Sequence, residues 1–343
     1  IRHEANAQVA AGAVLLDVNC CGPCVDESED LERAVFAASG ASSAPLVIDT
    51  SVPTALEKAL QAADGKVLIN SVNGEAISLA KVLPLARRYG AAVIGLALDE
   101  EGIPDTAEGR VAVARRIHGA VLAAGLPEQD LVIDCLTLTV SAEQKRALET
   151  LRTLRMVQDQ LGLATALGVS NISFGLPSRP VLSSVFFAMA LEAGLKVAII
   201  NPKDQRMMDA YRSAMVLLGY DVRAESYISN YADQAASKPA IDIRDDTKPG
   251  ICHQLTSAIV DGDNEGIVTL VEQALQGGMD AMTISNQGLL PGLEEVGRRF
   301  ADNRIFLPQV MQSAETMQSA FGCLKKIMAG QTGPSRGRIL MAT

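Results

Sequence analysis

A short apolar run followed by a helical segment recurs through the first two-thirds of the sequence. The runs are continuously apolar rather than alternating, which is typical of parallel strands that are covered on both faces. The segment 106–124 has apolar residues at helical spacing and is an example of the amphipathic helices expected between the strands. The predicted strands are 13–19, 45–51, 66–73, 91–99, 131–137, 164–171 and 196–201.

Seven such units predict a (β/α)8 TIM barrel with one strand unaccounted for. A doubly wound sheet is the competing architecture. The barrel is favoured because the predicted strands lack a glycine-rich phosphate loop and nearly all end in Asp or Asn. The first barrel strand would precede residue 1, since the chain opens directly in a helical segment at 4–11. We therefore expect a barrel whose first strand is missing from this chain, as in a fragment.

The pattern changes after residue 231. Residues 232–249 sustain no apolar period and predict a linker, while 250–330 read as helix throughout. Short connections between its segments predict an all-α four-helix bundle. Residues 331–343 predict a second linker and the start of a truncated domain, so the barrel would occupy 1–231. The predicted helices of the bundle are 251–260, 264–276, 280–300 and 307–328.

Composition narrows the class of partner. The 343 residues carry a net charge of −10, contain 3% aromatic residues and lack Trp, which argues against a nucleic-acid partner. No stretch predicts a transmembrane span or a signal peptide, so we expect a cytoplasmic protein without membrane contact. Six cysteines are too few for a disulfide scaffold.

Carboxylates and amides at the predicted strand ends are the main functional signal. Asp49, Asn70, Asp134 and Asn171 would converge on one mouth of a barrel. Carboxylates accept hydrogen bonds and amides both donate and accept, so the set suits a flat heterocycle such as a pterin. The alternative is that these residues only end strands and cap the following helices.

The cysteines and histidines indicate little chemistry. Cys20, Cys21 and Cys24 lie close together but form a single C-x-x-C spacing, so we expect no metal site and ordinary loop thiols. The three histidines are scattered and suggest no Ser-His-Asp arrangement. The Met and aromatic residues of the bundle predict either plain core or a soft apolar lid over a large ligand.

Several motifs resemble the cobalamin-dependent methionine synthase family. The tail G-R-I-L-M-A-T (337–343) is similar to the first strand of that family's cobalamin domain, and F-L-P-Q-V-M-Q-S-A-E-T-M (306–317) resembles the helical cap before it. The motifs that resemble its pterin-binding domain are D-V-N (17–19), I-D-T-S (48–51), L-I-N-S-V-N-G-E (68–75), I-D (133–134) and G-V-S-N-I-S-F-G (168–175). The resemblance covers essentially the whole chain.

The resemblance implies transfer of the N5-methyl group of 5-methyltetrahydrofolate to cob(I)alamin during methionine synthesis. Asn171 and Asp134 would be catalytic. Cobalamin would contact Phe300, Leu307 and Val310 of the cap and be held mainly by a domain absent from this chain. A homocysteine domain or another methyl acceptor would be a further partner. The implied folate-binding residues are Asp17, Asn19, Asp49, Asn70, Asn73, Asp134, Asn171 and Arg179.

Two other functions stay open at this point. Dihydropteroate synthase shares the pterin barrel, but it would need a Ser-Thr-Arg-Pro loop where this chain has the cysteine segment 20–24. A non-enzymatic cobalamin-binding regulator would carry the helical cap without the polar strand ends. The family's Gly-Glu-Arg motif of the first strand and its Asp-x-His-x-x-Gly motif are both absent from this sequence.

Overall fold

The computed structural model describes residues 1–20, 26–235, 250–302 and 304–328. The chain is divided into two compact units, Ile1–Leu218 and Gly219–Thr343. The domain boundaries at residues 231, 249 and 330 stay predictions, because most of the linker 232–249 and all of 331–343 lie outside the described residues. Among the helices that are described, none is both long and apolar enough to cross a membrane.

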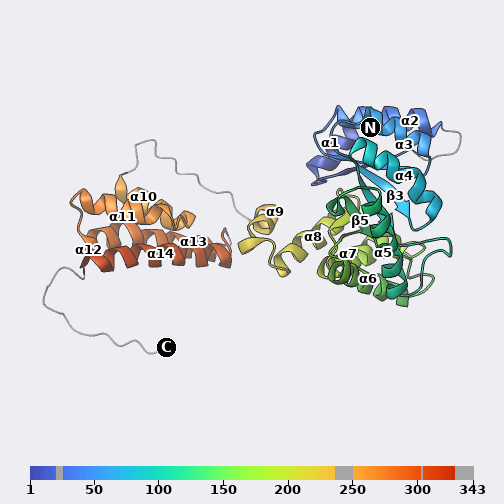
Figure 1. The fold of residues 1–343 in the computed structure, drawn as a ribbon. Coiled ribbons are helices and arrows are strands. Elements are labelled where there is room, and N and C mark those ends of the chain that lie inside the picture. Colours follow the sequence, from blue (N-terminus) through green and yellow to red (C-terminus); the bar gives the residue numbers. More distant parts are fainter. Residues whose placement is uncertain (21–25, 236–249, 303, 329–343) are drawn as a thin grey trace. The chain divides into compact units, whose positions relative to one another are not determined.

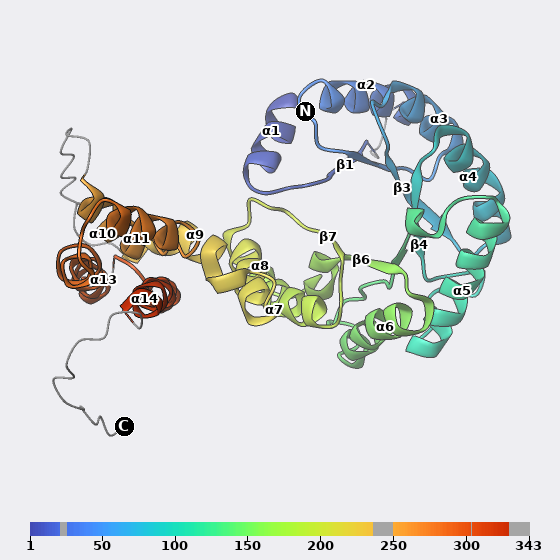
Figure 2. The same cartoon turned by 60° about the vertical axis from the view of Figure 1, so that its left-hand side comes forward.

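A sheet of seven parallel strands forms the centre of the first unit in the described part of the chain. The strands pair in chain order, as in a barrel, whereas a doubly wound sheet reverses its order near the middle. β1 and β7 are the edges of this sheet, which curves around a common centre in Figure 2. The strands are β1 (Leu16–Asn19), β2 (Leu46–Asp49), β3 (Leu68–Asn73), β4 (Ala92–Leu96), β5 (Leu131–Asp134), β6 (Ala164–Gly168) and β7 (Val197–Ile199).

Helices cover the outside of the curved sheet (Figure 2). Asp26, Thr106 and Asp204 cap the first turns of α2, α5 and α8 by accepting backbone N–H groups. The helices are α1 (Arg2–Ala10), α2 (Glu27–Ser39), α3 (Pro53–Ala62), α4 (Ala76–Tyr89), α5 (Ala107–Ala123), α6 (Lys145–Leu161), α7 (Arg179–Glu192) and α8 (Gln205–Leu217), with short turns η1 (Glu128–Asp130) and η2 (Val169–Ser173).

The strands β2 to β6 are largely buried on both faces, whereas the edge strands β1 and β7 are partly exposed. Ile48, Ile69 and Ile133 pack outward into the large cluster between sheet and helices. Val47 and Val132 belong to a separate cluster inside the sheet's curve. Burial on both faces explains why the sequence shows continuous apolar runs, and the seven predicted strands and the barrel architecture are confirmed. The first barrel strand expected ahead of residue 1 stays a prediction.

The second unit is helical, and its predicted bundle is confirmed. In Figure 1, α10, α11, α13 and α14 lie side by side around a core that includes Leu255, Val271 and Leu324. The predicted helix 280–300 is present but contains a π-helical stretch, η4. The elements are η3 (Val222–Ala224), α9 (Glu225–Ala235), α10 (Ile251–Asp261), α11 (Gly266–Gln276), α12 (Ala281–Thr283), η4 (Ile284–Leu289), α13 (Leu290–Ala301) and α14 (Leu307–Met328).

Two glycines bring η4 and α13 close to α10. A Cβ on Gly292 would lie 2.7 Å from Ile259 Cβ and 3.1 Å from Thr256 O, and a Cβ on Gly288 would lie 2.8 Å from Leu255 Cδ1. Thr256 Oγ1 also donates a hydrogen bond to Gly288 O at 2.8 Å. The bundle core therefore depends on a backbone approach that any larger residue would disturb.

Gly292→Ala is expected to destabilise the bundle by about 1–3 kcal/mol, because the new methyl group would overlap Ile259. Gly297 lies on the same helix with open space around its Cβ direction, so Gly297→Ala is expected to stabilise the bundle by about 0.5–1 kcal/mol. Hydrogen exchange across residues 251–325 of the full chain measures both changes. Equal effects of the two substitutions would contradict the close approach of α13 and α10.

Candidate functional site

A cavity lies above the apolar cluster that contains Val47 and Val132. Its floor is formed by the residues that come two positions later on each strand. Strand residues point alternately inward and outward, so the step from Val47 to Asp49, or from Val132 to Asp134, reaches the next inward position. The cavity measures about 630 Å³. Within the described strands, this second layer consists of Asp17, Asp49, Asn70, Leu96, Asp134, Gly168 and Ile199.

Predicted site residues from five segments meet in this cavity. Asp17, Asp49, Asn70 and Asp134 come from β1, β2, β3 and β5, and Asn171 comes from η2 after β6. The remaining wall is largely apolar and includes Ile103, Leu136, Leu138 and Ile200. The cavity thus combines hydrogen-bonding groups with apolar surface, a combination that fits a flat ring with a polar edge.

Asp17 and Asp49 form a crowded acidic corner. Burial and the neighbouring Asp49 carboxylate raise the pKa of Asp17 from 3.8 to about 6, against the opposing effect of a hydrogen bond with Asn70. Asn19 Nδ2 donates to Asp49 Oδ2 at 2.9 Å, so Asn19 supports Asp49 instead of lining the cavity. The pKa of the Asp17 carboxyl therefore lies closer to neutral pH than that of an ordinary aspartate.

Asp134 is the most enclosed carboxyl of the cavity. Its side chain is buried, and burial raises its pKa from 3.8 to about 6. The backbone N–H of Leu136, which donates to Asp134 Oδ1 at 2.8 Å, and the charge of Arg110 oppose this rise. A ligand that offers N–H donors would favour the ionised carboxylate, so this residue suits the polar edge of a ring.

Arg110 anchors the loop that follows β5. The side chain is fully buried, and its Nη1 donates to Cys135 O and Leu136 O, each at 3.0 Å. Its Nε donates to Pro104 O at 3.0 Å, which ties the same guanidinium to the segment before α5. Leu136 has a left-handed backbone with a φ of 62°, so the loop adopts a conformation that needs such support.

The loop that carries Asn171 is held by Arg179. Arg179 Nη2 donates to Ser170 O at 2.9 Å, and its guanidinium lies 5.6 Å from the centre of the Phe174 ring. A Cβ on Gly168 would lie 3.0 Å from Asn171 Nδ2, so glycine there leaves space for the amide. Arg179 does not line the cavity, and the structure gives it contacts that position the Asn171 loop.

Asn73 and the cysteines lie apart from the main cavity. Asn73 lines a neighbouring pocket of about 300 Å³, where its Oδ1 accepts the Glu75 N–H at 3.0 Å. Cys20 is a free, half-buried thiol, while Cys21 and Cys24 fall outside the described residues. Within the described parts of the chain, no group of three metal-ligating side chains is found.

The bundle presents apolar side chains on its surface. Phe300 is 46% exposed, Leu307 59% and Met311 57%, while Val310 is half-buried. Met317, by contrast, belongs to the core, so the predicted Met and aromatic set divides between core and surface. Phe300, Leu307 and Met311 are therefore accessible to another molecule.

The sequence did not single out Thr137, Ser71 or Asn201 as site residues, although all three line the cavity. Ser71 and Asn201 stand in segments that the motifs and strand ends had marked. Thr137 closes the predicted strand 131–137, but β5 ends at Asp134, so Thr137 lies in the following loop and strand alternation does not give its direction.

The fold and the cavity define a barrel protein with a ligand site at the carboxyl ends of its strands. Residues 1–201 match the family described as pterin binding enzyme, so the chain belongs to the family of pterin binding enzymes. Residues 251–325 match the family described as B12 binding domain. The predicted pterin barrel followed by a cobalamin-associated helical domain is confirmed.

Curated relatives carry both parts. The chain is 32% identical over 374 aligned positions to the methionine synthase of Mycobacterium leprae (strain TN), with 99% of this chain aligned. It is 31% identical over 364 positions to the methionine synthase of Mycobacterium tuberculosis (strain ATCC 25618 / H37Rv), again with 99% of the chain aligned. The chain spans about 30% of the length of each relative. These relatives confirm the resemblance to cobalamin-dependent methionine synthases.

Solved structures with a similar fold include dihydropteroate synthase of Yersinia pestis. One, with a pterine-sulfa conjugate, has a TM-score of 0.53 at 16% identity and covers 64% of this chain and 87% of that one. Another has a TM-score of 0.51 at 15% identity and covers 63% and 87%. At these identities the likeness shows the barrel fold alone.

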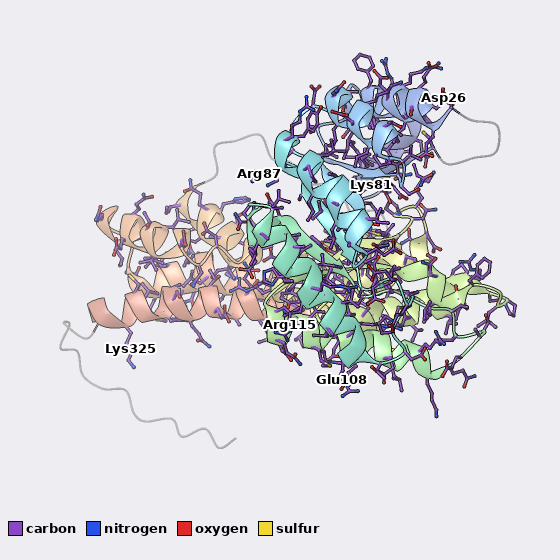
Figure 3. All side chains as sticks on the ribbon, turned by 45° about the vertical axis from the view of Figure 1, so that its right-hand side comes forward. Asp26, Lys81, Arg87, Glu108, Arg115 and Lys325 are labelled. Carbon is purple, nitrogen blue, oxygen red and sulfur yellow. The ribbon has the colours of Figure 1, made fainter. Side chains whose placement is uncertain are left out.

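Arg110→Met is expected to lower the free energy of unfolding of the barrel by about 2–5 kcal/mol, because the carbonyls of Cys135 and Leu136 would lose a buried donor. Arg115 lies on the same helix and is exposed (Figure 3). Arg115→Met is the control and is expected to change stability by less than about 0.5 kcal/mol. Urea unfolding of the full chain measures both, and a similar small loss for each would refute the anchoring role.

Asp134→Asn is expected to stabilise the ligand-free chain by about 1–3 kcal/mol at pH 8. The folded carboxyl has a pKa near 6 against 3.8 when unfolded, so the folded chain binds the proton more tightly and wild-type stability falls as pH rises from about 4 to 6. The amide escapes this loss. Denaturation at pH 4 and pH 8 tests the effect, and a gain of the same size at both pH values would contradict it.

Proposed function

We propose that the chain binds 5-methyltetrahydrofolate in the barrel cavity and takes part in transfer of its N5-methyl group to cob(I)alamin during methionine synthesis. The two family matches and the relatives named methionine synthase support this function. Because the chain spans about 30% of those relatives, the proposal includes partners. These are a domain that holds cobalamin and a domain that supplies homocysteine. A cytoplasmic location stays a prediction.

The observation that carries the proposal is the convergence of carboxyl and amide groups on one floor. Asp49, Asn70 and Asp134 offer acceptors and a donor at the base of the cavity, with apolar residues on its walls. A pterin is a flat ring whose edge alternates N–H groups and lone pairs, so this edge can pair with the floor while the faces contact Leu136 and Ile199.

The chemistry at N5 explains a role for an amide. As the bond between N5 and the methyl carbon breaks, its electron pair stays on N5, which must gain a proton or a hydrogen bond. Asn171 can donate or accept and so suits both protonation states of N5. The raised pKa of Asp17 gives the cavity a carboxyl that is protonated more readily than an ordinary aspartate. The protein therefore supplies orientation and a hydrogen bond at N5.

The helical unit supplies residues that fit a corrin. Phe300, Leu307 and Val310 would offer apolar side chains to the face of a large macrocycle, and the exposure of Phe300 and Leu307 supports this use. Bound cobalamin would supply the nucleophile that takes up the methyl group. The role of the three residues would be to contact the ring and exclude water from it.

Dihydropteroate synthesis is the second candidate, favoured by the fold of the solved neighbours. That activity would give no role to the helical unit, which matches the B12 binding domain. A regulator that only binds cobalamin would leave the polar floor of the barrel unexplained. Methyl transfer uses both units, so it is the function we prefer.

Asn171→Ala is expected to slow methyl transfer from 5-methyltetrahydrofolate to free cob(I)alamin by roughly 10²-fold or more, while weakening folate binding much less. The reason is that the amide acts as the bond to N5 breaks. Asp134→Asn is the contrasting variant and is expected mainly to weaken folate binding. Stopped-flow spectroscopy of the cobalt and folate titration measure the two effects.

Equal losses of rate and affinity in Asn171→Ala would remove this residue from the transition state. Absence of folate binding by the wild-type chain, together with condensation of a pterin pyrophosphate with 4-aminobenzoate, would replace the proposed function by dihydropteroate synthesis. Unchanged folate affinity in Asp134→Asn would count against its role in holding the ring.

A further inference from the structure

Thr137 carries a buried hydroxyl that lacks a hydrogen-bond partner among the described residues. The side chain is 8% exposed, and its Oγ1 is one of the few buried side-chain polar atoms left unpaired. Valine has nearly the same shape and would avoid this loss of hydrogen bonding. A threonine at such a position therefore calls for a partner that the folded chain does not itself supply.

The cavity is where that partner can enter. Thr137 lines the same 630 Å³ space as Asp134 and Asn171, on the loop between β5 and α6. Its sequence neighbours Leu136 and Leu138 also line the cavity and contribute apolar wall. A hydroxyl between two apolar side chains offers a ligand a hydrogen-bonding group at a defined place.

The backbone of the loop that carries Thr137 is held on both sides of this residue. On one side, Arg110 Nη1 holds Cys135 O and Leu136 O. On the other side, Thr139 Oγ1 donates to Phe174 O at 2.6 Å and the Val140 N–H donates to Ile172 O at 3.0 Å. Both ends of the short segment around Thr137 are thus fixed before any ligand binds, which is the arrangement that makes a single hydrogen bond effective.

We propose that the Thr137 hydroxyl hydrogen-bonds a heteroatom of the pterin ring and acts as a binding residue beside Asp134. This inference rests on the proposed function and adds a residue to it. A hydroxyl can donate to a ring lone pair or accept from a ring N–H, so it pairs with either kind of edge atom. The unpaired hydroxyl would thus lower the stability of the ligand-free chain and raise its affinity for the pterin ring.

Thr137→Val and Thr137→Ser test the inference in the full chain. Thr137→Val is expected to bind 5-methyltetrahydrofolate about tenfold more weakly, because it removes one hydrogen bond at nearly constant shape. Thr137→Ser keeps the hydroxyl and is expected to stay within about threefold of wild type. Thr137→Ala, which also lacks the hydroxyl, is expected to lose as much affinity as Thr137→Val and covers the case in which valine prevents folding.

A ligand-free measurement separates this inference from the proposed function. In the absence of folate, Thr137→Val is expected to raise the Tm of the barrel transition by about 2–4 °C, because it replaces an unpaired buried hydroxyl by a methyl group. A fall in Tm would show that the hydroxyl already has a partner in the free chain and would overturn the inference.

A truncated probe locates the contact on the ring. Tetrahydropterin without the aminobenzoyl-glutamate tail is expected to lose affinity by the same factor in Thr137→Val as the whole folate. A loss confined to the whole folate would overturn the contact with the ring. If wild type binds and Thr137→Val binds equally well, the inference alone fails. If wild type binds neither probe, the proposed function fails and this inference fails with it.

Discussion

The inward and outward alternation of strand side chains is the constraint on which the site depends. Inside the barrel, one layer of apolar residues fills the interior, and the next inward positions become the floor of the cavity. A strand that is shifted by one residue would turn Asp49 or Asp134 toward the covering helices, where a carboxylate has no water and no ligand. The strand pairing that builds the apolar core therefore also directs these carboxylates into the cavity.

The polar groups at the floor of the cavity lower the stability of the ligand-free protein, and other contacts must offset this loss. Asp134 is held where burial disfavours its charged form, Asp17 lies beside the Asp49 carboxylate, and the Thr137 hydroxyl lacks a hydrogen-bond partner among the described residues. The buried Arg110 works in the opposite sense, since its guanidinium satisfies carbonyls of the loop after β5 and places positive charge near Asp134. Polar groups held in place at a cost to the free protein are typical of sites prepared for a ligand.

The sequence predicted the strands and the bundle well because both depend on long apolar patterns. Asp49, Asn70 and Asp134 were found for the same reason, since each closes an apolar run, although five of the seven predicted strands run two or three residues past the observed ends. Arg110 escaped prediction because an arginine on an amphipathic helix looks like a surface residue until tertiary packing buries it. The π-helix η4 also escaped, since it depends on how closely Gly288 approaches α10.

The roles of individual loop residues were the least predictable part. Arg179 was expected at the folate, and its side chain contacts Ser170, Ser173 and Phe174 of the preceding loop. Asn73 closes a strand as Asp49 does, but it belongs to a neighbouring pocket. Side-chain direction in such segments follows from loop conformation, which sequence periodicity does not encode.

A crystal structure of the chain with 5-methyltetrahydrofolate tests the central claim most directly. The account predicts the pterin edge in hydrogen-bond contact with Asp49, Asn70 and Asp134, and N5 facing the Asn171 amide. A folate bound elsewhere, or bound with its ring turned so that the edge faces the apolar wall and the tail meets the polar floor, would contradict it.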